Sequence, residues 1–361
     1  MPAGGEVEIG WWPTARLAEL QSFIDREYRR GHVLASDAEL LRWQHPRSAD
    51  ELAIVGATSG GELLGILGVI PVSLCVHGRR ANGGWLTTWV VTSPWRRHQL
   101  GLRLLAFVSE HHDFVGTLGG NQTTVGILEA LRFHVRRFVP RWILPLTAGG
   151  CARLIGRNRT VGLPFVAGAA TAAGGGCVRA WSREIANDWD EVWRERLARQ
   201  LVGTWRDADY VRWRYVEHPR FRYRVRVALG GDRRPSALLA YRLEAVRGID
   251  AVVCRVVEAL GEAQGLEHLA RRLGREGREA GAAFADFYCT SNRYATGLER
   301  AGFIRDDALA VAFPSRFQPL EAAPRPLTAA FKLRACAEDA DLFAGDDVYF
   351  TRSDGDQDRP S

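Results

Sequence analysis

VTSPWRRHQLGLRLL (Val91–Leu105) marks the point at which a β-rich segment gives way to an apolar, helix-like run. Ser-Pro and two arginines occupy the turn, and a histidine, a glutamine and Gly101 follow them. The N-terminus of a helix presents free backbone N–H groups and the positive end of the helix dipole, which suit an anion. The stretch is therefore either a solvated turn or a binding site for the phosphates of a ligand.

The length and composition of the chain indicate a soluble protein of two domains. At 361 residues the chain exceeds the usual size of one domain, and its 46% hydrophobic and 25% charged content is ordinary for a globular protein. The net charge is +6, but the basic residues are spread along the chain without a block of like charges. We interpret the basicity as a background bias and expect no nucleic-acid partner.

Other features favour a cytoplasmic location. The six cysteines are scattered, without a CxxC pair or a His/Cys cluster, so neither a zinc site nor a disulfide framework is indicated. The N-terminus carries acidic residues and lacks the apolar core of a secretory signal. The longest weakly apolar stretch, GLPFVAGAATAAGGGCV, is too rich in glycine for a membrane span. We expect no metal ion and no membrane contact, and the sequence does not indicate the oligomeric state.

Two parts of the chain resemble each other. SDAELLRWQHPR (Ser36–Arg47) and RDADYVRWRYVEHPR (Arg206–Arg220) both contain Asp-Ala, an apolar pair, Arg-Trp and His-Pro, and each precedes two strand-like runs. The recurrence of the tryptophan and the histidine at matching places favours a structural role for both residue types.

The repeat extends over both halves of the chain. Each half is expected to contain, in order, a strand, a helix, a β-meander, a helix, a strand, a helix and a strand. This order predicts an α/β (α+β) protein of tandem domains, each a mixed, mostly antiparallel sheet flanked by helices. The expected parts are an N-terminal domain (1–146), a Gly/Ala-rich linker (147–178), a C-terminal domain (179–316) and a C-terminal extension with an acidic tail (317–361).

In this context the opening stretch resembles the acyl-CoA-binding signature of the GCN5-related N-acetyltransferase (GNAT) superfamily. Val91, Trp95 and Arg96 match the valine, the aromatic residue and the first arginine of that signature, and Gly101 matches its last glycine. Arg97 and Gln99 stand where the family usually has glycine. The segment NQTTVGILEALRF (Asn121–Phe133) resembles a second family motif, although Leu128 replaces the tyrosine that often protonates the leaving thiolate.

The resemblance covers nearly the whole chain as a tandem pair, but the halves differ at the phosphate turn. The second half has Glu262 there and no arginine, and a carboxylate would repel a pyrophosphate. The resemblance therefore implies that the first domain binds acyl-CoA and that a degenerate second domain shapes the acceptor pocket. The residues that it assigns to the co-substrate, acetyl-CoA or another short acyl-CoA, are Trp89, Val90, Val91, Arg96, Arg97, His98, Gln99, Leu100, Gly101, Leu102 and Asn121.

Candidate catalytic residues come from the second half, because Thr87 and Thr88 stand where many family members place a carboxylate base. Asp286 and Tyr288 share one face of a predicted strand, and Glu258 lies on the strand before it. A polar inter-domain strand and a buried ion pair are the alternative interpretations of these residues.

The tail YFTRSDGDQDRPS contains alternating aspartates. It is a solvated terminus, an ordered acidic turn that holds an amine or sugar hydroxyls, or a metal loop that lacks its final glutamate.

The sequence therefore predicts an acyltransferase that moves an acetyl or other short acyl group from CoA to a primary amine of a small molecule, such as an amino sugar or a specialised metabolite. One alternative is a FemABX-like transferase that uses aminoacyl-tRNA. Another is a non-catalytic acyl-CoA-binding protein, which the leucine at position 128 and the missing base would favour.

Overall fold

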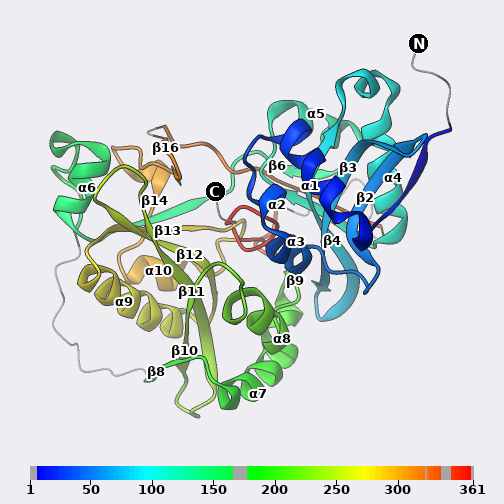
Figure 1. Cartoon of the computed structure of the whole chain (residues 1–361). Helices are drawn as coiled ribbons and strands as arrows, with labels where there is room; N and C mark the ends of the chain where they lie inside the picture. Colours follow the sequence, from blue (N-terminus) through cyan, green and yellow to red (C-terminus); the bar gives the residue numbers. More distant parts are fainter. Residues whose placement is uncertain (1–5, 166–176, 322, 335–342, 359–361) are drawn as a thin grey trace.

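The computed structural model describes residues 6–165, 177–321, 323–334 and 343–358. The chain forms two lobes, one built mainly from each half, with the C-terminal segment between them (Figure 1). Each lobe contains one large mixed sheet. This arrangement confirms the predicted fold class.

The first lobe is built on a long antiparallel meander. Its sheet has the order β1-β2-β3-β4-β5-β17-β6, and β9 and β18 extend it from the far end of β3. The strands contributed by the first half are β1 (Glu8–Pro13), β2 (Glu51–Ser59), β3 (Glu62–Val76), β4 (Arg79–Val91), β5 (Phe114–Leu118) and β6 (His134–Arg136). The helical elements are η1 (Thr14–Arg16), α1 (Leu17–Phe23), η2 (Ile24–Tyr28), α2 (Val33–Ser36), α3 (Ala38–Gln44), η3 (Ser93–His98), α4 (Leu100–His111) and α5 (Gln122–Ala130).

The second lobe repeats this plan. Its sheet has the order β14-β7-β13-β12-β11-β10-β8. The strands are β7 (Arg141–Pro145), β8 (Cys177–Ala180), β10 (Arg224–Leu229), β11 (Pro235–Ala245), β12 (Val252–Gly261), β13 (Ala282–Tyr288) and β14 (Ile304–Arg305). The helical elements are α6 (Ala148–Ile155), η4 (Arg157–Arg159), α7 (Arg183–Val192), η5 (Trp193–Leu197), η6 (Ala198–Gln200), α8 (Ala208–Val211), η7 (Arg212–Val216), α9 (Ala263–Glu279), α10 (Ala295–Arg300) and η8 (Asp306–Ala308).

The remaining strands lie in or near the connection between the lobes. They are β9 (Val202–Thr204), β15 (Arg316–Phe317), β16 (Leu320–Glu321), β17 (Ala329–Leu333) and β18 (Val348–Tyr349).

The two sheets exchange one strand each. β17, from the end of the chain, lies between β5 and β6 in the first sheet, and β7, from the first half, lies between β13 and β14 in the second. Read from β1 and from β8, the two sheets have the same succession of strands, and the exchanged strand takes the same place in each. The expected N-terminal domain (1–146) includes β7, but this strand completes the second sheet, so that boundary is wrong.

Strand pairing also cuts across the other expected boundaries. Helix α6 falls within the expected linker, yet its buried Cys151, Leu154 and Ile155 pack with Phe284 of β13 in the second lobe. Eleven of the linker residues, 166–176, lie outside the described part of the chain. β17, which falls in the expected C-terminal extension, belongs to the first sheet. Each lobe therefore contains segments from both halves of the chain, and the lobes are not two successive domains.

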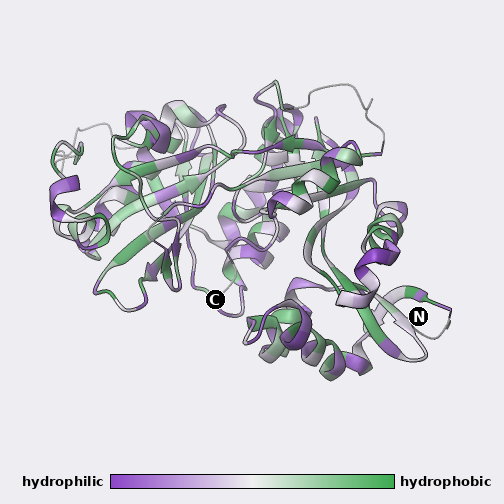
Figure 2. Ribbon diagram, turned by 90° about the horizontal axis from the view of Figure 1, so that it is seen from above, coloured by the Kyte–Doolittle hydropathy of each residue, from purple (hydrophilic) through white to green (hydrophobic). Residues whose placement is uncertain are grey.

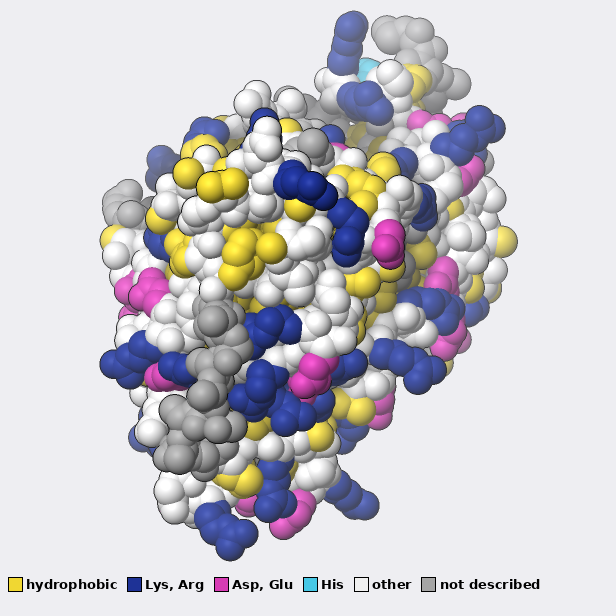
Figure 3. Space-filling view, turned by 90° about the vertical axis from the view of Figure 1, so that its left-hand side faces the viewer, with side chains coloured by type: hydrophobic (Ala, Val, Ile, Leu, Met, Phe, Trp, Pro, Cys, Tyr) yellow, Lys and Arg dark blue, Asp and Glu magenta, His cyan; other side chains and the backbone are white. Residues whose placement is uncertain are grey.

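Hydrophobic residues concentrate in the central strands of both lobes, whereas the helices carry both hydrophilic and hydrophobic positions (Figure 2). The alternation of apolar side chains on helices produces this pattern, since one face packs on a sheet and the other meets water. Figure 3 shows one face of the molecule, on which Lys and Arg side chains are spread out with Asp and Glu among them.

The repeated segments meet at the junction of the halves. Trp43 of α3 and Trp213 of η7 stack with ring centroids 5.1 Å apart, and Trp43 also contacts His218. Asp37 and Asp207 cap the helices that begin the two repeats, and each aspartate also pairs with an arginine from the other half, Arg220 and Arg80 respectively. The sequence repeat therefore forms much of the contact between the halves.

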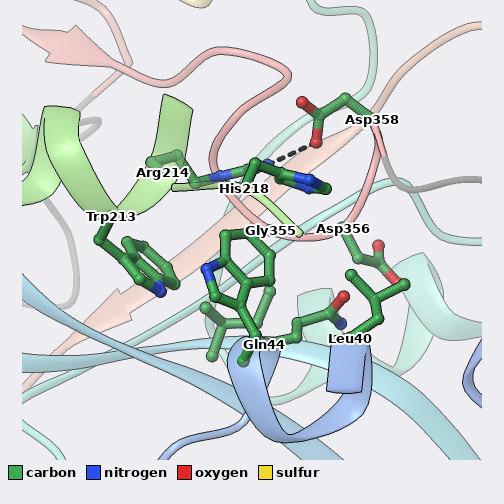
Figure 4. A pocket seen from close by; sticks show the side chains of 10 residues that line it. Leu40, Gln44, Trp213, Arg214, His218, Gly355, Asp356 and Asp358 are labelled. Carbon is green, nitrogen blue, oxygen red and sulfur yellow. Dashed lines mark hydrogen bonds and ion pairs between the residues drawn. The ribbon is translucent and has the colours of Figure 1, made fainter. Parts of the chain in front are cut away.

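The acidic tail is an ordered, buried turn in this junction. Arg214 forms ion pairs with Asp358, as Figure 4 shows beside Trp213, Gln44 and Leu40. Asp354, which is 1% exposed, pairs with Arg206 at 2.6 Å. Two of the three alternating aspartates thus bind arginines of the second half, and among the described residues no group of carboxylates, histidines and cysteines could hold a metal ion.

Candidate active site

Strand β4 separates from its neighbour β5 near the middle of the first sheet. The parallel pairing of the two strands covers only Gly83–Trp85 of β4. Beyond Trp85, β4 continues to Val91 without a partner on that side among the described strands. The unpaired edge leaves backbone N–H and C=O groups of β4 available to a ligand.

A bulge lies within this unpaired part of β4. Ile66 of β3 pairs with Val90 and Gly68 pairs with Thr87, so that Thr88 and Trp89 together face the single residue between them. Thr88 has a φ of 42°, in the left-handed region. A bulge turns backbone groups away from the regular ladder and is common beside active sites. Here it directs the end of β4 toward the opening between the strands.

The turn after β4 leads directly into α4. Ser93–His98 form the short helix η3, Gln99 has a left-handed φ of 57°, and α4 begins at Leu100. No side chain caps the first turn of α4. Arg96 donates from Nε to the carbonyl oxygen of Val91 at 2.9 Å, while Arg97 and His98 are exposed. The uncapped N–H groups and the adjacent arginine side chains suit an anion such as a pyrophosphate.

Two more of the predicted co-substrate residues, Gly101 and Asn121, shape the backbone around the end of β4 and the start of α5. A Cβ atom on Gly101 would lie 3.2 Å from the indole nitrogen of Trp89, so the glycine lets α4 approach β4 closely. Asn121 caps α5, since its side chain accepts a hydrogen bond from the backbone N–H of Thr124 at 2.8 Å. Both Trp89 and Asn121 also line the large cavity described next.

A cavity of about 680 Å³ lies at the junction of the halves. Its first-half wall includes Thr87, Thr88 and Trp89 of β4 and Gly119–Asn121 before α5. Its second-half wall includes Arg242 and Glu244 of β11, Arg255 of β12 and Tyr288 of β13, and the tail adds Arg352, Asp356 and Gln357. The cavity is large enough for a small-molecule acceptor together with an acyl group.

The three predicted catalytic residues have different surroundings. Tyr288 lines the cavity, and burial raises the pKa of its hydroxyl, which therefore stays protonated at neutral pH. Asp286 does not line it: this carboxylate is fully buried and accepts from Arg141 at 3.0 Å and Arg352 at 3.3 Å. Of these two residues, Tyr288 therefore lines the cavity and Asp286 does not.

Glu258 is part of a buried ion pair, which was one of the two interpretations of its position. It is 1% exposed, lies 2.5 Å from Arg206 and accepts a hydrogen bond from the hydroxyl of Tyr215 at 2.9 Å. Burial raises the pKa of Glu258. Tyr349 of the tail donates a further hydrogen bond to the same carboxylate. These contacts fill the place that a substrate would need.

Among its described residues, the second half shows no equivalent opening. The backbone N–H of Ala259 on β12 donates to the fully buried hydroxyl of Tyr349 at 3.3 Å. This contact lies beyond Val256, the last residue of β12 that pairs with β13. The tail therefore occupies the position where β12 would separate from β13. Glu262 precedes α9 and pairs with Arg196 at 2.8 Å.

Sequence reasoning missed most of the second-half wall. Arg242 and Glu244 alternate within the otherwise apolar strand β11, and this signal of polar residues on one strand face was available in the sequence. Ser315 gave no such signal, because a long fold-back of the chain brings it to the cavity. Asp356 belongs to the tail, for which an ordered acidic turn that holds an amine was one of the sequence interpretations.

No protein-family model and no curated protein matches the sequence. Solved structures do resemble the chain over about nine-tenths of its length. N-myristoyltransferase from Saccharomyces cerevisiae with bound myristoyl-CoA matches at 11% identity with a TM-score of 0.54, covering 92% of this chain and 83% of the yeast protein. A GCN5-related N-acetyltransferase from Anabaena variabilis matches at 8% identity and a TM-score of 0.55, covering 92% and 74%. A GCN5-related N-acetyltransferase from Kribbella flavida matches at 13% identity with a TM-score of 0.51, covering 91% of this chain and 71% of that protein.

These similarities confirm the predicted fold, which is that of the GNAT superfamily in a two-lobed arrangement. In the part of the chain that the structure describes, no helix has the length and apolar character needed to cross a membrane.

Proposed function

We propose that the protein is an acyl-CoA-dependent N-acyltransferase that transfers an acetyl or other short acyl group to a primary amine of a small molecule. The observation that carries this proposal is the separation of β4 from β5 beside the uncapped start of α4, at the edge of the inter-lobe cavity. The neighbours of the same fold are N-acyltransferases, which supports the assignment of the reaction class.

The residues around the opening suit each part of an acyl-CoA. The pyrophosphate would lie at the first turn of α4, with Arg96, Arg97 and His98 beside it. The pantetheine would run along the unpaired edge of β4 and exchange hydrogen bonds with its backbone, as an additional strand would. Backbone N–H groups at the bulge, near Thr88 and Trp89, would donate to the carbonyl oxygen of the thioester.

The reaction joins the amine nitrogen to the carbonyl carbon of the thioester and breaks the bond from that carbon to sulfur. The nitrogen loses one proton and the departing thiolate gains one, so the amine must first be in its neutral form. Tyr288 is a protonated donor at the cavity, and Asp356 is a carboxylate on its tail side. We assign Asp356 to orienting the amine and Tyr288 to the supply of a proton.

Calorimetric titration with acetyl-CoA and an assay of free-thiol release test this proposal. We expect binding in the micromolar range and thiol release that depends on an added amine. Arg96→Glu together with Arg97→Glu should weaken binding at least tenfold, whereas Arg271→Glu on the exposed face of α9 should not. A protein that shows no heat with acetyl-CoA at tens of micromolar would not be an acyl-CoA enzyme.

The same experiments separate the alternatives. Binding of acetyl-CoA without amine-dependent thiol release would favour a non-catalytic acyl-CoA-binding protein. Transfer from an aminoacyl-tRNA in place of acetyl-CoA would favour the FemABX-like alternative. A series of acyl-CoA chain lengths would define the acyl group, since Leu86 and Leu128 line the first-half side of the cavity.

A further inference from the structure

Three arginines gather on the second-half side of the inter-lobe cavity. Arg242 lies on β11, Arg255 on β12 and Arg352 in the tail, and each is only 6% exposed although it lines the cavity. Arginine side chains are almost never this buried unless they are paired. Their surroundings therefore decide what the cavity can bind.

The carboxylates around these arginines only partly balance their charge. Glu244 accepts from Arg255 at 2.7 Å and from Arg242 at 3.0 Å. Asp286 is shared between Arg352 and Arg141 in the same way. Four arginines thus share two buried carboxylates, and the half-exposed Asp306 lies 3.8 Å from the outer side of Arg141. Over the whole lining of the cavity, six arginines face three carboxylates.

The guanidinium group of each of the three arginines also lies over an aromatic ring. The guanidinium carbon of Arg242 lies 3.8 Å from the ring centre of Phe221, that of Arg255 4.5 Å from Phe317, and that of Arg352 4.3 Å from Tyr288. Stacking fixes the plane of a guanidinium and leaves its N–H edge free to donate.

One donor of this cluster has no partner. Nε of Arg242 is buried and has no hydrogen-bond partner among the described residues. A buried charged donor without a partner is costly, and an incoming acceptor oxygen would remove that cost.

We propose that the acceptor is an anionic amine, one that carries a carboxylate, and that this carboxylate binds to Arg242, Arg255 and Arg352. The inference rests on the proposed function and adds the class of its acceptor. A carboxylate has the planar, two-oxygen geometry that matches the arginine fork, and these guanidiniums already bind the carboxylates of Glu244 and Asp286. With the carboxylate at this wall, the amine extends toward Thr87 and Thr88 on the opposite wall, where the hydroxyl oxygens are buried and have no partner among the described residues.

Matched amines that differ in one group test this proposal. The sets are glycine and glycinamide, and glucosamine with its 6-carboxylate (2-amino-2-deoxyglucuronic acid) and its 6-phosphate. Each is measured for binding to the protein with and without CoA, by calorimetry or ligand-observed NMR, and for thiol release with acetyl-CoA. We expect each amine that carries a carboxylate to bind at least tenfold more tightly than the matched amine without one.

Variants of the arginines identify the site of this preference. Arg242→Gln and Arg352→Gln should each reduce the preference for the carboxylate member at least fivefold, and Arg242→Lys should restore part of it. Both glutamine variants are expected to fold, because Glu244 keeps Arg255 and Asp286 keeps Arg141 as partners. Arg271→Gln, which removes an exposed arginine paired with Glu267, is the matched control and should keep the full preference.

The outcomes are distinct. Equal binding of the matched amines with and without a carboxylate overturns the inference. A carboxylate preference that survives in both glutamine variants overturns it too, as does a preference for the 6-phosphate alone. Carboxylate preference without any binding of acetyl-CoA would instead overturn the proposed function and leave the anion site standing.

Discussion

Trp43 and Trp213 occupy matching positions of the two sequence repeats, and their indole rings stack on each other with centroids 5.1 Å apart. An internal repeat therefore packs against its own copy at the junction of the halves. The cavity proposed to bind both substrates opens at the same junction, so the stability of this contact bears directly on function.

Replacement of either tryptophan should destabilise the protein and the two effects should not add. Trp43→Ala or Trp213→Ala is expected to lower the free energy of unfolding by about 2–3 kcal/mol, because both rings are only partly buried. The double variant should lose about 1 kcal/mol less than the sum of the single losses, since the stacking can be lost only once. Urea unfolding of the four proteins measures the coupling, and strict additivity would show that the stacking contributes nothing.

The repeat shows how far the sequence predicts the fold. The succession of elements in each half and the turn before α4 both follow from local patterns. The exchange of β7 and β17 does not, because both strands are apolar and would satisfy either sheet; only the pairing partners differ. A local pattern specifies that a strand forms, whereas its place in a sheet is decided by contacts distant in sequence.

The candidate site also contains some residues that the sequence predicts and others that it does not. The residues of β4 and α4 were predicted, since they are adjacent in sequence. Arg352 was not predicted, and Asp356 was covered only by one of three interpretations of the tail, because the tail returns to the junction from the end of the chain. An alternating acidic segment also has the composition of a solvated terminus. Contacts with residues far away in sequence, among them Arg206 and Arg214, make it a buried turn.

The exchanged strands should make the two lobes unfold together. If the chain is divided after residue 165, the first fragment lacks β17 and the second lacks β7. We expect neither fragment to fold alone and both to form a stable complex when they are produced together. Circular dichroism and size-exclusion chromatography of the separate and combined fragments test this, and an independently folded first fragment would contradict it.

Loss of Arg206 should be among the most damaging changes. Arg206→Met leaves Glu258 and Asp354 buried without their shared cation and is expected to lower stability by about 3–5 kcal/mol. Arg212→Met is a suitable control, because Arg212 is the first residue of η7, pairs with Asp209 and is about half exposed. Its loss should change stability by less than about 0.5 kcal/mol. Thermal unfolding of both variants measures the difference, and similar losses would show that the buried network is not needed.

His218 should make the protein sensitive to acid. Burial, together with the nearby Arg214, lowers the pKa of this histidine from 6.5 to about 3, and its Nδ1 accepts hydrogen bonds from the backbone N–H groups of Arg220 and Phe221. Between pH 6.5 and pH 3 the unfolded chain therefore binds a proton that the folded chain does not, so stability falls as the pH falls through this window. At pH 5 the loss from this one group is about 2 kcal/mol.

The variant His218→Gln should show a shallower decline in stability from pH 7 to pH 5 than the parent protein, whatever its stability at pH 7. Phe221→Leu, which alters the packing on the same ring without removing a titrating group, is the control and should keep the parent's slope. Urea unfolding at a series of pH values gives both slopes. Equal slopes for His218→Gln and the parent would rule out this histidine as a source of acid sensitivity.

Gln99 tests whether the turn before α4 holds the phosphates. Its left-handed φ of 57° is unfavourable by about 1 kcal/mol for a residue with a side chain and worse for a β-branched one. Gln99→Gly should therefore keep the turn and bind acetyl-CoA within about threefold of the parent. Gln99→Val should displace the first N–H groups of α4 and weaken binding at least tenfold, or about 1.4 kcal/mol. Calorimetry compares the two variants, and a valine variant that binds as tightly as the glycine variant would place the phosphates elsewhere.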